Sequence, residues 1–290
     1  MATQEAPARR PPASKEPDRP KPSRGPARAP ATPPTRRQRL RRRYAVVYDI
    51  DGPRVRLGIL WFVAASMALV VGPLAAAIVY GGCAALAAAQ SARVWRRRKQ
   101  RPNRLVAAGL AGGMALGACL GAGGAGLALL TATAAAVAVA TVDRKSRNPA
   151  VTDAGWTVQC ALPVGVAAMS MVLVMRIDQG SAIALLLLVS AYETGDYLVG
   201  SGARNPYEGP VAGVAAITVV TFIVSTLSIS AFDVGQAWLF GGAVAILAPL
   251  GQLFASALLP AAGAPASALR RLDSLLLAAP VWWLGVAAVT

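Results

Sequence analysis

The sequence predicts an all-α integral membrane protein with about nine transmembrane helices and a disordered, basic N-terminal tail. Three observations predict this class. Hydrophobic residues make up 55% of the 290 residues and charged residues only 14%, whereas soluble domains carry about 25% charged residues. From residue 57 onward, the charges form short clusters between long apolar stretches, as in polytopic membrane proteins. The third observation is the distribution of basic residues between the two sides of the predicted helices.

Residues 1–43 are rich in Pro, Arg and Ala and nearly free of large apolar side chains. Such a segment cannot bury a core, so we expect a disordered cytoplasmic tail. The formal net charge of the chain is +16, and much of the excess lies in this tail. We therefore expect an anionic lipid surface as its partner, and no nucleic acid. A solvated tail that only fixes the topology is the alternative, and both can hold.

Residues 44–56 are predicted to form a short interfacial lead-in, with a turn at Asp51–Gly52–Pro53. The polytopic domain then covers residues 57–290. Two charge-free stretches each break in the middle, at Gly72-Pro73 and at residues 121–126, so each predicts two helices. The expected spans lie within 57–92 (two), within 105–141 (two), and at about 156–175, 181–199, 210–230, 236–259 and 274–290.

The basic residues test this number of helices and set the orientation. With the N-terminus inside, every Lys and Arg except Arg176 falls on the inner side. An incorrect number of helices would scatter them, because cytoplasmic loops of membrane proteins carry the excess of basic residues. We expect a multi-pass protein of the plasma membrane with a cytoplasmic N-terminus and an external C-terminus. The high Arg and Ala content is typical of a bacterium with a GC-rich genome.

The chain contains no histidine and three cysteines. Histidine-based catalysis and histidine metal ligands are thereby excluded, so a metal site would use oxygen ligands and favour Mg²⁺-like ions. Cys83, Cys119 and Cys160 fall far apart in apolar segments and are interpreted as small core residues.

Gly109, Gly113, Gly117 and Gly121 recur every four residues along one predicted helix. Small residues at this spacing let helices approach closely. We expect packing within the chain, with a homodimer face as the alternative.

Most acidic residues of the membrane domain lie at the cytoplasmic ends of its helices. Glu193 and Asp196 are three residues apart, so they share one helix face. A carboxylate within a span is costly and by default marks a functional site. A helix-end charge solvated by headgroup water is the plainer interpretation, and it fits Glu193 less well than Asp196 because Glu193 lies one turn deeper.

The order of several short motifs resembles the phosphatidate cytidylyltransferase (CDP-diacylglycerol synthase) family of membrane enzymes over about residues 57–290. Its acidic-Thr-Gly-x-Tyr-x-x-Gly stretch is matched at residues 193–200, and its aromatic-Glu-Gly at Tyr207–Gly209 after Asn205-Pro206. Its Gly-Asp-x-x-x-Ser helix end is matched by Gly251 and Ser256. Its terminal Asp-Arg-x-Asp-Ser-Leu-Leu run followed by Ala-Pro, the most specific piece, is matched at residues 270–280.

The resemblance implies transfer of a cytidylyl group: the phosphate of phosphatidate attacks the α-phosphorus of CTP, and pyrophosphate leaves. Divalent cations on carboxylates, helped by Lys and Arg, neutralise such phosphate charges. Mg²⁺ is the implied cofactor of an active enzyme, and CTP and membrane phospholipid are its implied partners. The implied catalytic residues are Asp273, Glu208 and Glu193; the implied substrate-binding residues are Asn205, Ser256, Arg204 and Arg271; the implied metal ligands are Asp273 and Glu208.

This chain departs from the family pattern where catalysis should occur. Gln252 replaces the Asp that follows Gly251, and Arg270 replaces the first Asp of the terminal run, which reverses the sign of charge at a ligand position. The Lys-Arg after Ser256 is replaced by Leu259-Pro260. A basic stretch before Glu208 is also absent, and the loop before Asp273 is shorter than in the family.

Three functions therefore compete. The first is a lipid-nucleotide enzyme with a rebuilt site, and the second is a non-catalytic paralogue that binds lipid or a partner protein and needs no cofactor. The third is a small transporter, since Gly-broken helices and intramembrane acids occur there too. For Asp273 we expect a position facing the polar pocket between the helices at 181–199 and 236–259. There it can pair with an arginine (Arg204, Arg270 or Arg271), cap its helix, or hold a cation with Glu208.

Overall fold

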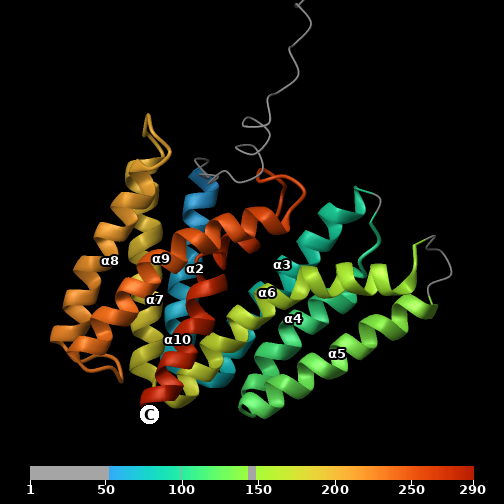
Figure 1. Cartoon of the computed structure of the whole chain (residues 1–290), viewed down its shortest axis with the longest axis horizontal. Helices are drawn as coiled ribbons and strands as arrows, with labels where there is room; N and C mark the ends of the chain where they lie inside the picture. The colour runs from blue at the N-terminus through green and yellow to red at the C-terminus, as the bar shows by residue number, and fades with distance from the viewer. Residues whose placement is uncertain (1–51, 99, 143–147) are drawn as a thin grey trace, which may run out of the picture. The chain divides into compact units, whose positions relative to one another are not determined.

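The computed structural model of the chain describes residues 52–98, 100–142 and 148–290. These parts contain nine α-helices, one 3₁₀ turn and no strand. Figure 1 shows the helices as one bundle. In chain order they are α2 (Gly52–Val71), α3 (Pro73–Arg96), α4 (Arg104–Ala118), α5 (Ala122–Val142), α6 (Ala150–Ile177), α7 (Gln179–Gly200), α8 (Glu208–Thr226), α9 (Val234–Leu258), η1 (Leu269–Arg271) and α10 (Leu275–Val289).

The all-helical class is confirmed, and each predicted helix has its counterpart. The two predicted breaks arise at glycines with positive φ, Gly72 at 139° and Gly121 at 94°. Pro73 then starts α3, where its missing N–H has no helical partner to lose. α2 begins at Gly52, within the predicted lead-in of residues 44–56. The predicted tail and the rest of the lead-in lie outside the described residues.

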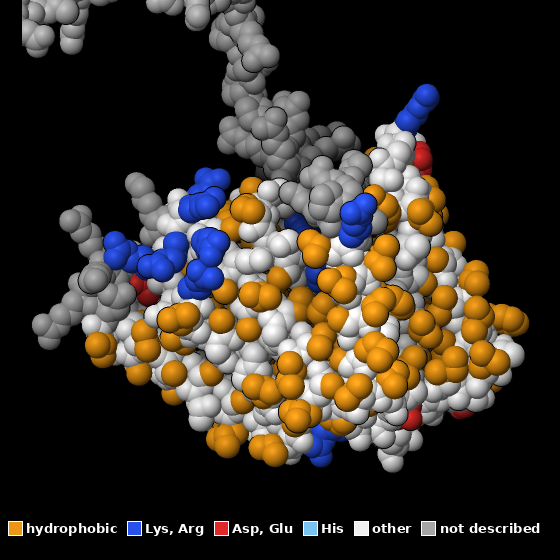
Figure 2. Space-filling model, turned by 180° about the vertical axis from the view of Figure 1, so that it is seen from behind, with side chains coloured by type: hydrophobic (Ala, Val, Ile, Leu, Met, Phe, Trp, Pro, Cys, Tyr) orange, Lys and Arg blue, Asp and Glu red, His pale blue; other side chains and the backbone are white. Residues whose placement is uncertain are grey.

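Six of these helices are long and apolar enough to cross a membrane: α3, α5, α6, α7, α8 and α9. The chain is thus a multi-pass membrane protein. Three shorter apolar helices accompany them, α2 from Arg56, α4 and α10, so length and composition support six of the nine expected spans. Apolar side chains are spread over the face in Figure 2, and basic side chains gather mainly toward one end. The loops α7–α8 and α9–η1 lie at one end of the bundle, and the C-terminus lies at the other (Figure 1).

The predicted glycine stripe is only partly used for packing. Gly117 packs closely on α5, since an added Cβ would lie 2.6 Å from the carbonyl oxygen of Gly124. A Cβ on Gly109 or Gly113 would meet nothing within 4 Å, so the packing prediction is wrong for these two residues. α4 instead packs through a neighbouring face, where Gly112 meets Gly81 of α3. The spacing defines a small-residue face, but the bundle uses a face rotated from it.

Two further close approaches position the helices that carry the acidic residues. A Cβ on Gly195 of α7 would lie 2.8 Å from the carbonyl oxygen of Ala212 in α8. A Cβ on Gly213 would lie 2.6 Å from the ring of Tyr192. α7 and α8 therefore pack nearly backbone to backbone, which orients the C-terminal end of α7.

Candidate functional site

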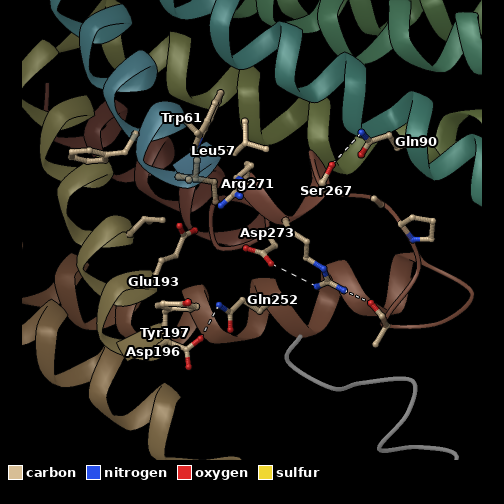
Figure 3. Close-up of a pocket in the computed structure, with 18 of the residues that line it drawn as sticks. Leu57, Trp61, Gln90, Glu193, Asp196, Tyr197, Gln252, Ser267, Arg271 and Asp273 are labelled. Atoms are coloured by element: carbon tan, nitrogen blue, oxygen red, sulfur yellow. Dashed lines mark hydrogen bonds and ion pairs between the residues drawn. The ribbon is translucent and has the colours of Figure 1, made fainter. Parts of the chain in front are cut away.

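A pocket of about 950 Å³ lies among α2, α3, α7, α9 and the segment that leads from α9 into α10. Figure 3 shows Glu193, Arg271 and Asp273 converging on it. One wall is apolar and is built from Leu57, Ile59, Trp61 and Phe62 of α2 and from Leu186 and Val189 of α7. Much of the remaining lining is polar and charged, and it includes Glu193, Asp196, Arg271 and Asp273. The pocket therefore offers both apolar and charged side chains, which suits an amphiphilic ligand.

Four arginines belong to the polar part of the pocket lining. Arg93 and Arg97 come from the last turn of α3 and the residue after it, and Arg270 and Arg271 come from η1. The Arg271 guanidinium lies against α2, because an added Cβ on Gly58 would lie 2.9 Å from its Nη1 atom. Arginines suit phosphate because the planar guanidinium offers several N–H donors at fixed angles.

Two carboxylates of α7, Glu193 and Asp196, line the same pocket. Asp196 is only 3% exposed, so it is not a helix-end charge solvated by headgroup water. Gln252 of α9 donates from Nε2 to Oδ2 of Asp196 at 3.2 Å. The Tyr192 hydroxyl donates to Oε1 of Gln252 at 3.2 Å. Gln252 thus occupies an oxygen of Asp196 instead of adding a carboxylate to the site.

Asp273 faces the pocket from the segment between η1 and α10, as predicted, and is 6% exposed. Its Oδ1 accepts the Ser274 backbone N–H at 2.8 Å. Its Oδ2 lies 3.7 Å from Nη1 of Arg270. Burial raises the pKa of Asp273 to about 6, and the charge of Arg270 opposes this rise. Arg270 is thus the charged partner of this buried carboxyl.

Arg270 holds the segment after α9 together. Its Nη1 donates to the Ser256 hydroxyl at 3.1 Å, and its Nη2 donates to the carbonyl oxygen of Ala262 at 2.7 Å. α3 fixes the same segment from the other side. Gln90 accepts the Ala268 N–H at 2.9 Å, and the Trp95 indole donates to the Leu258 carbonyl at 2.8 Å.

Gly251 is the closest backbone contact in the site. A Cβ at this position would overlap the carbonyl oxygen of Asp273. The glycine of the Gly-Asp-x-x-x-Ser resemblance is therefore required here for the approach of the residue 272–274 segment to α9.

The structure brings together only some of the residues that the sequence implied. Glu193, Asp273 and Arg271 line the pocket. Ser256 is fully buried beneath Arg270 and does not line it. Glu208, Asn205 and Arg204 are exposed at or next to the α7–α8 loop, away from the pocket lining, and Asn205 donates to Glu208 at 2.8 Å.

Three residues that line the pocket were not predicted as site residues from the sequence: Gln90, Arg93 and Arg97. The two arginines belong to the basic stretch at residues 93–104, and the positive-inside rule already explained its charges. Only the position of α3 against the segment after α9 reveals that two of them reach the pocket. Gln90 is the only amide side chain of α3, and this was the one signal available.

The donors present do not fit the Mg²⁺ that the resemblance implies. Among the described residues, no group of three or more His, Cys, Asp or Glu side chains is arranged to hold a metal ion. Glu208, the expected second ligand, lies outside the pocket, and Arg270 is the charged partner of Asp273. A divalent ion needs several oxygen ligands at about 2.0–2.6 Å, and a guanidinium beside the carboxylate opposes it.

A model of the cytidylyltransferase family matches residues 53–263, from α2 through the α9–η1 segment. No curated protein matches the sequence significantly. The match covers well over half of the chain and includes the α7 and α9 motifs of the resemblance, while the terminal run at residues 270–280 lies outside the matched residues. The chain belongs to the cytidylyltransferase family.

Proposed function

We propose that this chain is a non-catalytic member of the cytidylyltransferase family that binds a phosphate-bearing lipid in the α2–α3–α7–α9 pocket. One observation supports this most directly. Arginines and apolar side chains line the same pocket, while Gln252 and Arg270 stand where the family pattern has carboxylates. The protein keeps the means to bind an anionic amphiphile and lacks the usual means to hold a catalytic metal.

The apolar wall supports a lipid in preference to a free nucleotide. Leu57 and Ile59 of α2 are 57% and 62% exposed, although both also line the pocket. We infer that the pocket opens laterally toward hydrocarbon at these two side chains. An acyl chain can lie there while the phosphate meets Arg271, Arg93 and Arg97.

An active cytidylyltransferase is the second candidate. The convergence of Glu193 and Asp273 on one pocket favours it. In that case the two carboxylates would hold a cation near the phosphates of CTP, and Arg271 would neutralise charge on the leaving pyrophosphate. The Arg270–Asp273 pair is the main argument against this reading.

Replacing Arg271 by alanine is expected to weaken phosphatidate binding by about tenfold or more, because a hydrogen bond to a charged group contributes about 1.5–3 kcal/mol. The measurement is the amount of phosphatidate retained by the purified full chain from mixed detergent micelles, with diacylglycerol as the phosphate-free comparison. Arg104→Ala, at an exposed arginine outside the pocket, is the control and should bind like the parent. Equal retention of phosphatidate and diacylglycerol by the parent would reject the proposal.

We also propose nine spans in the plasma membrane, with the N-terminus in the cytoplasm. Six helices meet the length criterion for a span, and the shorter α2, α4 and α10 would cross with thinning of the bilayer or with the help of their neighbours. The positive-inside distribution of Lys and Arg supports this orientation. A C-terminal reporter should be active outside the cytoplasm, and activity restricted to the cytoplasm would exclude an odd number of spans.

The same orientation gives the basic tail an anionic surface to bind. Residues 1–43 would associate with acidic headgroups of the inner leaflet, an interaction screened by salt. This association would concentrate anionic lipid near the start of α2, whose first turns line the pocket.

A further inference from the structure

We propose that Arg270 acts as a built-in cation in place of the divalent metal, so that ligand binding in this pocket is independent of divalent ions. The inference rests on the proposed function for the identity of the ligand. Its structural part, the exclusion of the metal, stands on the contacts of Arg270, Gln252 and Asp273 alone. Arginine keeps its charge at any physiological pH, so this cation cannot be removed by chelation or deprotonation.

Three contacts within the chain fix the position of the Arg270 guanidinium. Its guanidinium donates to the Ser256 hydroxyl at 3.1 Å and to the Ala262 carbonyl at 2.7 Å, and Nη1 lies 3.7 Å from Oδ2 of Asp273. The side chain is 18% exposed and lines the pocket. These contacts join α9, the segment after it and the entrance to α10 around one positive charge.

Both oxygens of the Asp273 carboxylate, which a metal would need as a ligand, already have partners within the chain. Oδ1 of Asp273 accepts the Ser274 N–H, and Oδ2 faces Arg270. A cation at this carboxylate would have to displace the guanidinium or lie beside a like charge. Gln252, the other residue that replaces a carboxylate of the family pattern, adds no metal ligand near Asp196. Its amide donates to Asp196 and so covers one oxygen of that carboxylate.

Both changes act in the same direction. Gln252 removes one negative charge relative to the family pattern, and Arg270 exchanges a negative charge for a positive one. The pocket therefore gains positive charge near Asp273, which attracts phosphate without help from a metal. Replacing Gln252 and Arg270 by aspartate should therefore create a site that binds a divalent metal ion.

Mn²⁺ binding to the purified, lipid-free full chain, followed by electron paramagnetic resonance, tests the exclusion directly. The parent and Asp273→Asn should bind the same amount of Mn²⁺, because Asp273 holds none. A Mn²⁺ site that is present in the parent and absent in Asp273→Asn would overturn the inference. This comparison needs no lipid, so it is decided even if the proposed function fails.

The double variant Gln252→Asp/Arg270→Asp is the gain-of-function arm. It should acquire a Mn²⁺ site that is lost again when Asp273→Asn is added. A folded double variant without this site would contradict the assignment of the exclusion to these two residues. If the double variant does not fold, the comparison of the parent with Asp273→Asn still decides the matter.

Phosphatidate retention provides the second readout. The parent should retain the same amount in excess EDTA as with Mg²⁺. A requirement for Mg²⁺ would overturn the inference while leaving lipid binding intact. Loss of retention under both conditions would instead reject the proposed function, and the Mn²⁺ comparison would still test the role of Arg270.

Discussion

Gly251→Ala is expected to destabilise the membrane domain and to abolish phosphatidate retention. The new Cβ would overlap the carbonyl oxygen of Asp273, and this contact is with backbone, which cannot rotate away. Overpacking of this kind costs about 1–3 kcal/mol. The shift needed to relieve it would move Asp273 and η1 away from α9, and thereby pull two arginines out of the pocket.

Thermal unfolding in detergent measures the first effect. A loss of about 1–3 kcal/mol lowers the melting temperature by roughly 2–4 °C for each kcal/mol in a chain of this size class. Gly242→Ala is the matched control on the same helix, since its Cβ would meet nothing within 4 Å. The control should be neutral or slightly stabilising, because alanine favours a helix more than glycine does. Equal melting temperatures for the two variants would contradict the close approach at Gly251.

Arg270→Ala is expected to lower stability by about 3–5 kcal/mol, since it leaves a buried carboxylate without its charged partner. The Ser256 hydroxyl and the Ala262 carbonyl lose their donor in the same variant. Arg270→Lys should recover part of the loss, because lysine keeps the charge and lacks the planar fork that reaches two acceptors at once.

A double-mutant cycle separates the ion pair from the other contacts. Asp273→Asn should restore part of the stability lost in Arg270→Ala, because the uncompensated buried charge is removed. The measured quantity is the coupling free energy between the two substitutions, from unfolding in detergent. Strictly additive losses would show that Arg270 and Asp273 do not stabilise each other and would remove the basis for the built-in cation.

The helices and their breaks could be predicted because local chemistry determines them. Gly72 adopts a φ of 139° ahead of Pro73, so no helix can continue through that point. The apolar lengths between charge clusters set most remaining boundaries to within a few residues, as at α7 and α9. α6 is an exception, because it begins at Ala150 and not at about residue 156. The start of α2 was misplaced because a Gly-Pro pair suits the first turn of a helix as well as a turn.

The site was harder to predict because it depends on which helix ends meet. Asp273 faces inward as expected, since a carboxylate at a membrane helix end gains most from a buried partner. Glu208 belongs to the same family resemblance as Asp273, yet it begins α8 at an exposed position. The stripe of Gly109 and Gly113 failed for a related reason. Spacing identifies a face of small residues, but only tertiary packing determines whether another helix occupies it.

The most direct test of the central claim is an assay of the purified full chain with CTP, phosphatidate and Mg²⁺. The account predicts that phosphatidate is retained while no CDP-diacylglycerol forms and no pyrophosphate is released. The same protein serves both measurements, so a misfolded sample cannot imitate the expected result. CTP-dependent formation of CDP-diacylglycerol that is abolished in Asp273→Asn, at unchanged expression, would contradict the account and establish the enzymatic alternative.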